Sequence, residues 1–505
     1  MDAAAEGRIE ESWLAPDLVD AVPVDWARRN GVLPLRIGGR KIYAGAPETP
    51  LQAFEDLALL LGEEAEWRRF AAEEIRRAID KTYFRRAGAA TAAAALAEGA
   101  AGGGADDGRR ESDDLLSSGG AAPVAQYVNA ILLEAVRLGA SDIHVEPFAD
   151  KLAVRYRLDG ILYEQPSPPR PLEAPLVARL KVMAKMDLAE KRLPQDGVAR
   201  VRVGSREIDI RVSSVPVAEG ERIVLRILHR EAANLPLERL GMAEGLLAEW
   251  KRLLASPHGI ILVTGPTGSG KTTTLYATLG GLDTARLNVL TIEDPIEYQL
   301  PGIGQIQVHP KIGLTFASGL RHVLRQDPDV ILVGETRDLE TAEIVVRASL
   351  TGHLVFTTLH TNDAPGAVVR MTDMGIPPYL LASALRAVLA QRLVRRLCPH
   401  CREAVEFPAD EAARLGRPEL AGRPVFRAHA AGCPACLGGY KGRTGIHELM
   451  LATPELAEAV RLNAPVRELA AIAAEGGYRP LAEDGLAKVL SGVTTLSELR
   501  RSTGR

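Results

Sequence analysis

The sequence lacks the features of an exported or membrane-spanning protein. No apolar run approaches the ~18 residues that a membrane-spanning helix needs, and the first ten residues hold neither the basic nor the apolar stretch of a secretory signal. The net charge of −4 gives no basic excess to attract nucleic acid. Four cysteines in 505 residues are too few for a disulfide framework. We therefore expect a cytoplasmic protein without a nucleic-acid partner, which reaches a membrane only through other proteins.

The most specific feature that is present is a glycine-rich turn. Residues 260–263 form an apolar run typical of a buried strand, and residues 273–279 favour a helix. The pattern Gly265-x-x-x-x-Gly270-Lys271-Thr272 lies between them, where glycines let several backbone N–H groups point at one anion beside a helix N-terminus. Lys271 would supply charge for the phosphates, and Thr272 a hydroxyl for Mg²⁺. The turn therefore predicts a nucleoside triphosphate site, in which ATP would contact Gly265, Pro266, Thr267, Gly268, Ser269, Gly270, Lys271, Thr272 and Thr273.

Three later apolar runs, at residues 288–292, 330–333 and 354–359, also end in polar residues. In open parallel α/β sheets, ligands bind at the carboxyl ends of the strands. We expect Glu293 and Glu335 to activate water and to hold Mg²⁺, Glu335 together with Thr272, although spacing does not decide which carboxylate is the base. His360 is expected to sense the γ-phosphate.

The four cysteines form two Cys-x-x-Cys pairs, Cys398/Cys401 and Cys433/Cys436. Two such pairs complete a closed tetrahedral zinc site. The separation of the pairs exceeds the usual ~15–20 residues, so we expect them to bracket an inserted loop. A redox pair or four unrelated thiols are the alternatives. A structural zinc module at about residues 397–440 is the prediction.

Composition divides the chain into four parts. Residues 1–86 form a small mixed unit with a partner-docking or a merely structural role. Residues 87–122, rich in Ala, Gly, Ser and Asp, are expected to be a flexible linker. Residues 123–232 begin with an amphipathic helix and continue with two hairpins, one turning at Asp159-Gly160 and one at residues 204–205. Residues 233–505 carry the nucleotide motif.

Several long motifs, in one order from residue 123 to the C-terminus, resemble the secretion ATPases of the GspE family, the assembly motors of bacterial type II secretion. They include SDIHVEP at 141–147, TIEDPIEY at 291–298 and an atypical Walker B motif at 324–338. Residues 22–34 resemble the partner-binding domain of that family. The resemblance implies an α/β fold: a RecA-like P-loop ATPase domain with a zinc-binding insert, after an α+β PAS-like domain and a small N-terminal docking domain.

The resemblance also implies how the protein works. Arg211 and Arg226 match arginines that reach the phosphates from the second domain, and Arg321 and Arg325 match a pair near the site. A homohexamer would hydrolyse ATP and drive pseudopilus assembly, bound to an inner-membrane docking subunit and to a platform protein, and peripheral on the cytoplasmic face of that membrane. Type IV pilus extension ATPases share similar segments and remain the alternative.

Two alternative functions, from other classes of protein, predict different biochemical behaviour. A nucleic-acid translocase would show salt-dependent stimulation by DNA. A nucleotide-switched scaffold would bind ATP but hydrolyse it no faster than the Lys271→Ala variant.

Overall fold

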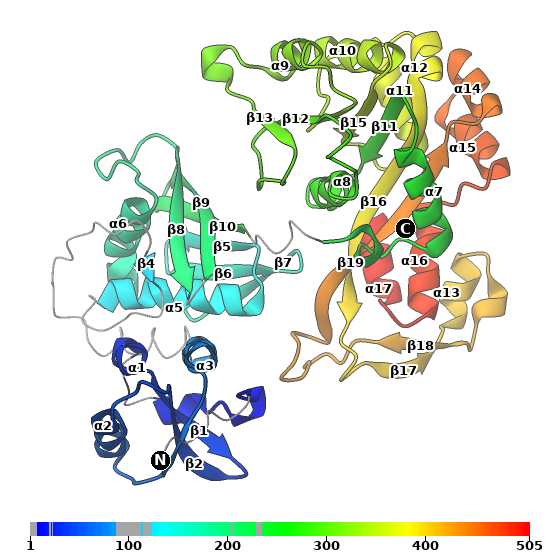
Figure 1. Ribbon diagram of the computed structural model, residues 1–505. Helices are drawn as coiled ribbons and strands as arrows, with labels where there is room; N and C mark the ends of the chain where they lie inside the picture. Colours follow the sequence, from blue (N-terminus) through cyan, green and yellow to red (C-terminus); the bar gives the residue numbers. More distant parts are fainter. Residues whose placement is uncertain are drawn as a thin grey trace. The chain divides into compact units, whose positions relative to one another are not determined.

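The computed structural model describes residues 8–19, 22, 24–86, 113–114, 123–203, 206–228 and 235–504. It divides into two compact units, Met1–His229 and Arg230–Arg505 (Figure 1). Apart from residues 113–114, the expected linker at 87–122 lies outside the described residues, as does the expected boundary at residue 232.

The first unit begins with the short helices η1 (Glu11–Trp13) and η2 (Pro16–Val19) and a three-stranded sheet of order β1-β2-β3. The strands are β1 (Val32–Ile37), β2 (Arg40–Gly45) and β3 (Glu66–Arg69). The α-helices of this part are α1 (Val24–Asn30), α2 (Leu51–Leu61) and α3 (Ala72–Arg86). The short edge strand β3 is defined by its parallel pairing with β2.

The rest of this unit is a seven-stranded sheet of order β4-β8-β9-β10-β5-β6-β7, in which only the β4–β8 pair is parallel. Its elements are β4 (Asp113–Asp114), α5 (Pro123–Leu138), β5 (Asp142–Pro147), β6 (Leu152–Leu158), β7 (Ile161–Gln165), η3 (Arg170–Leu172), α6 (Glu173–Met183), β8 (Gln195–Val203), β9 (Arg206–Val217) and β10 (Gly220–Leu228). The strands of both predicted hairpins pair antiparallel, β6 with β7 and β8 with β9, whereas the expected turn at residues 204–205 lies outside the described residues. Asp159 and Gly160 adopt positive φ between β6 and β7, as a tight two-residue turn requires.

The second unit is built on a seven-stranded sheet of order β13-β12-β14-β15-β11-β16-β19, parallel except for β19. Its strands are β11 (Gly259–Thr264), β12 (Val289–Glu293), β13 (Gly304–Gln307), β14 (Val330–Val333), β15 (Leu354–Leu359), β16 (Leu385–Leu397) and β19 (Tyr440–Leu451). Ile260 and Leu262 pack into the core on one face, whereas Ile261 and Val263 pack into the core on the other. Both faces are therefore buried, which explains why the strands read as continuous apolar runs.

Helices cover both faces of this sheet (Figure 1). The helices of this unit outside the insert are η5 (Leu237–Arg239), α7 (Glu244–Leu254), α8 (Lys271–Leu279), η6 (Pro310–Ile312), α9 (Phe316–Val323), α10 (Leu339–Leu350), α11 (Ala364–Asp373), α12 (Pro378–Ala384), α14 (Pro454–Arg461), α15 (Val466–Glu475), α16 (Leu481–Leu490) and α17 (Leu496–Thr503). The insert between β16 and β19 is folded rather than a bare loop. It contains β17 (Glu403–Glu406), α13 (Ala409–Arg414), η7 (Pro418–Leu420) and β18 (Pro424–Arg427).

Candidate functional site

The glycine-rich turn connects the central strand β11 to α8. Every residue of β11 is buried, and α8 begins at Lys271, directly after Gly270. Gly265, Gly268 and Gly270 have φ angles of +149°, +78° and +90°. L-residues with side chains rarely adopt such angles, so the turn needs glycine at these positions. The result is a loop that ends at a helix N-terminus, where backbone N–H groups attract anions.

Strand β16 supports this loop from a distant part of the chain. Gln391 Nε2 donates a hydrogen bond to Ser269 O at 2.8 Å. A Cβ atom on Gly265 would lie 2.5 Å from Gln391 O and 2.6 Å from Ser269 Oγ, so no side chain fits there. Ser269 Oγ is buried and has no hydrogen-bond partner among the described residues. The loop is thus held in shape while retaining one unused polar atom.

Lys271 folds over the loop that precedes it. Its Nζ donates to Gly265 O at 2.8 Å and to Pro266 O at 3.3 Å. Burial lowers the pKa of Lys271 to about 8; the charge of Arg392 lowers it further, and that of Glu335 opposes the shift. The amine is therefore a cation that is poorly solvated, and an added anion would stabilise it.

Glu335 follows β14 and lies beside two basic side chains. Its Oε2 is 2.5 Å from Arg337 Nε and 3.7 Å from His360 Nε2. Burial lowers the pKa of His360, and the positive charge of Lys271 adds to this effect. The structure therefore brings Lys271, Glu335 and His360 to one edge of the sheet, as the strand ends predicted.

Glu293, the last residue of β12, has different surroundings. It is only 4% exposed, and its carboxylate accepts hydrogen bonds from Tyr276, Thr291 and Gln305. The two expected acids thus differ: Glu335 faces cations, and Glu293 is surrounded by neutral donors.

The expected arginines have partners in their own neighbourhoods. Arg321 pairs with Glu340 at 2.6 Å, and Arg325 bonds His322 at 2.7 Å; neither of these contacts involves the glycine-rich loop. Arg211 and Arg226 are directly opposite each other on β9 and β10 of the first unit. Asp142 on β5 fixes Arg226 through a 2.9 Å ion pair.

The four cysteines come together as their spacing predicted. Their Sγ atoms all lie within 4.8 Å of one another, with pairs at 3.5, 3.6 and 3.8 Å. A tetrahedral zinc ion with Zn–S bonds of ~2.3 Å places sulfurs about 3.8 Å apart. The donors and their spacing therefore fit zinc, and the four thiolates would complete its coordination.

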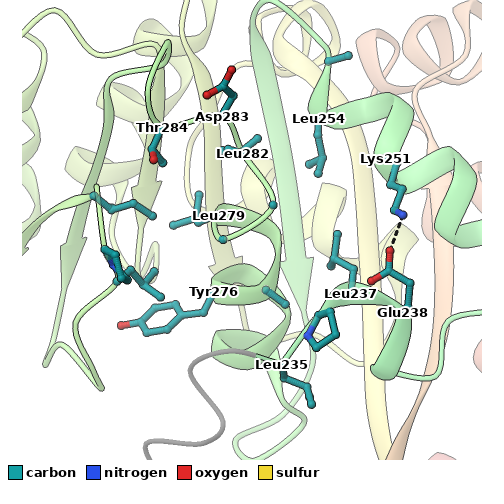
Figure 2. Close-up of a pocket in the computed structure, with 18 residues that line it drawn as sticks. Leu235, Leu237, Glu238, Lys251, Leu254, Tyr276, Leu279, Leu282, Asp283 and Thr284 are labelled. Atoms are coloured by element: carbon teal, nitrogen blue, oxygen red, sulfur yellow. Dashed lines mark hydrogen bonds and ion pairs between the residues drawn. The ribbon is translucent and has the colours of Figure 1, made fainter.

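A separate pocket lies beside the C-terminal end of α8 (Figure 2). Its volume is about 790 Å³, and it lies between η5, α7, the C-terminal end of α8 and residues 300–303. None of its lining residues belongs to the glycine-rich loop, although Tyr276 stands at its edge. It is therefore distinct from the predicted phosphate site.

Comparison with known proteins identifies the family. Residues 117–501 match the family described as Type II/IV secretion system protein. The chain belongs to this family. Residues 8–89 match the MshEN domain.

Secretion proteins of this family are similar over most of the chain. Type II secretion system protein HxcR of Pseudomonas aeruginosa is 54% identical over 383 residues, which cover 76% of this chain and 78% of that protein. Type II secretion system ATPase E of Vibrio cholerae is 52% identical over 387 residues, 76% of each chain.

Solved structures show a similar fold. The Legionella pneumophila ATPase DotB matches with a TM-score of 0.55 at 20% identity, over 74% of this chain and 95% of DotB. The pilus retraction motor PilT, solved with ADP, matches with a TM-score of 0.50 at 27% identity, over 74% of this chain and 95% of PilT.

These findings confirm the predicted family and fold class. Within the described ranges, no helix is long and apolar enough to cross a bilayer. Two residues of β16 act on the glycine-rich loop: Gln391 donates a hydrogen bond to Ser269 O, and the charge of Arg392 lowers the pKa of Lys271. The sequence did not predict these roles, because no local pattern links β16 to the loop. Arg337 was detectable, since it lies two residues after Glu335.

Proposed function

We propose that this member of the type II/IV secretion family hydrolyses ATP and couples hydrolysis to type II protein secretion by driving pseudopilus assembly. The observation that carries the proposal is the glycine-rich loop with Lys271 folded over it, beside Glu335 and His360. The names of the similar proteins favour secretion over the pilus alternative, because both relatives are type II secretion proteins.

Binding would rest on the loop and on Lys271. Backbone N–H groups at the start of α8 would receive the phosphates, and the Lys271 ammonium would leave its carbonyl partners to pair with them. The unused Ser269 Oγ and the open space around Gly268 fit a phosphate chain at this place. Thr272 and Glu335 would hold Mg²⁺, which supplies charge neutralisation between the phosphates.

Hydrolysis would depend on Glu335 and His360. Glu335 is a carboxylate beside Lys271, suited to accept a proton from water near the terminal phosphate. A lowered pKa keeps His360 neutral near pH 7, so that one ring nitrogen can accept a hydrogen bond and the other donate one. Arg211, Arg226, Arg321 and Arg325 would bring further positive charge.

Zinc would act as a structural cross-link. Four thiolates leave no coordination position for a substrate, so the ion would hold the folded insert to the ends of β16 and β19.

Assembly and location belong to the same proposal. A homohexamer would place Arg211 and Arg226 at nucleotide sites, and the domain at 1–86 would bind an inner-membrane docking subunit. An inner-membrane platform protein would receive the motion, so the ATPase would work on the cytoplasmic face of that membrane. The chain would then comprise three domains, 1–86, 123–232 and 233–505, with residues 87–122 between the first two.

The decisive experiment measures phosphate release from Mg²⁺-ATP by the purified full-length chain. Lys271→Ala should lower the rate at least 100-fold, whereas the matched Lys251→Ala, at a half-exposed lysine on α7, should leave it unchanged. Equal rates for Lys271→Ala and the wild type would contradict the proposal. Stimulation by DNA that vanishes at high salt would favour a translocase.

A further inference from the structure

Glu293, at the end of β12, accepts hydrogen bonds from neighbouring side chains with both of its carboxylate oxygens. One oxygen of Glu293 accepts hydrogen bonds from Thr291 Oγ1 at 2.6 Å and from Gln305 Nε2 at 3.1 Å. The other accepts a hydrogen bond from the Tyr276 hydroxyl. At 4% exposure, this carboxylate has little access to water. Its hydrogen bonds come from three elements: α8, β12 and β13.

The same contacts organise the connection between β12 and β13. Gln305 also donates to Tyr298 O at 3.2 Å, and its Oε1 accepts from Leu300 N at 2.7 Å. The backbone N–H of Glu297 donates to the Tyr276 hydroxyl at 3.3 Å. The Tyr276 and Tyr298 rings meet edge to face, with centroids 4.6 Å apart. The carboxylate is therefore the centre of a network that reaches residues 297, 298 and 300 of this connection.

Tyr276 links this network to the phosphate site. It lies on α8, five residues after Lys271 and four after Thr272. Burial and its hydrogen bond to Glu293 raise the pKa of Tyr276, so the phenol keeps its proton and remains a donor. Figure 2 shows the ring projecting from α8 away from the helix axis. A contact at this position limits the rotation and sliding of the helix that begins with the phosphate-binding lysine.

We propose that Glu293 is a positioning residue: through Tyr276 it fixes α8 against β12, and so sets Lys271 and Thr272 in place. Glu335 is then the carboxylate that faces the nucleotide. This differs from the role that the sequence suggested for Glu293, and it rests on the proposed ATPase function. Three of the roughly four acceptor sites of this carboxylate are already used. Turning the group toward a nucleotide would break these hydrogen bonds and leave buried donors unsatisfied, at a cost of about 1–3 kcal/mol each.

The test compares Tyr276→Phe, Glu293→Gln, the double variant and Glu335→Gln in the full-length chain, through kcat and KM for Mg²⁺-ATP. Loss of helix positioning weakens ground-state and transition-state binding alike, so KM rises and kcat changes little. We expect KM to rise about tenfold in each of the first two variants. The double variant should be no worse than either single one, because both remove the same contact. Glu335→Gln should lower kcat at least 100-fold with KM nearly unchanged.

Tyr379→Phe is the matched control, because Tyr379 is 59% exposed on α12 and should keep wild-type kinetics. A large fall in kcat for Glu293→Gln, with Tyr276→Phe like the wild type, would overturn the proposal. Wild-type KM in both variants would also overturn it. If Glu293→Gln fails to fold, Tyr276→Phe carries the test alone, since it removes a single oxygen atom.

Failure of the ATPase function would be recognised separately. The wild-type chain would then release no phosphate, and the affinity for a fluorescent nucleotide would replace KM as the measurement. Equal, non-additive losses of affinity in Tyr276→Phe and Glu293→Gln would still support positioning, and unequal losses would refute it.

Discussion

Nucleotide affinity should fall at alkaline pH because Lys271 loses its proton there. Burial lowers the pKa of this lysine to about 8, well below its usual 10.5. Of the two forms of Lys271, only the protonated one carries a charge that attracts phosphate. Nucleotide affinity should therefore follow the protonated fraction of Lys271, which is about 0.9 at pH 7 and about 0.1 at pH 9. The dissociation constant should therefore rise about tenfold over this range. An ordinary exposed lysine would show almost no change below pH 9.

The assay is fluorescence anisotropy of a labelled nucleotide with Mg²⁺ at constant ionic strength, from pH 7 to pH 9.5. Lys271→Ala should bind weakly, with no decline centred near pH 8. Glu335→Gln should shift the midpoint to lower pH, because the Glu335 charge raises the pKa of Lys271. Glu249→Gln is the control, since Glu249 pairs with Arg252 on the surface of α7. Constant wild-type affinity up to pH 9.5, or a decline that Lys271→Ala shares, would refute the reasoning.

Two predictions concern the C-terminal part of the second unit. Cys433→Ser should lower the zinc content from one ion per chain to nearly none, measured by elemental analysis, and should lower the melting temperature. Its nucleotide affinity should stay within threefold of the wild type. A loss of affinity equal to that of Lys271→Ala would contradict a purely structural role for zinc. Glu498, which is 2% exposed and pairs with Arg395 at 2.7 Å, should be needed for stability: Glu498→Gln should cost about 3 kcal/mol, or ~6–12 °C in melting temperature by calorimetry. Although burial alone would raise the pKa of Glu498, its bonds to Arg501 and Arg395 lower it to about 2. The wild type should therefore lose this stabilisation as the pH falls from about 4.5 toward 2, so the difference in stability between the wild type and Glu498→Gln should shrink over that range.

Local patterns were sufficient for the strand–loop–helix unit and for the cysteines. The loop is one continuous stretch, and its glycines at 265, 268 and 270 adopt positive φ angles, so their identities reveal the geometry. Cysteine pairs with two residues between them are similarly informative, because a single turn must present both sulfurs to one ion. The buried parallel strands were also recognisable as apolar runs, and the residues that follow them lie at one edge of the sheet.

Long-range contacts could not be predicted in this way. The hydrogen bond from Gln391 to Ser269 joins residues 122 positions apart, and only the placement of β16 beside β11 brings them together. Glu293 and Glu335 both follow apolar strands, and nothing in their spacing separates their roles. Their surroundings do: Tyr276 and Gln305 donate to Glu293, whereas Arg337 and His360 lie beside Glu335.

The sequence by itself therefore determined which chemical groups this protein carries: a glycine-rich loop before a helix, strand-end acids and a cluster of four cysteines. Tertiary structure alone decided which acid is buried and hydrogen-bonded, and how far the pKa of Lys271 falls. The physical reason is that backbone conformation is set by neighbouring residues, whereas burial and charge depend on groups that the fold brings from distant positions.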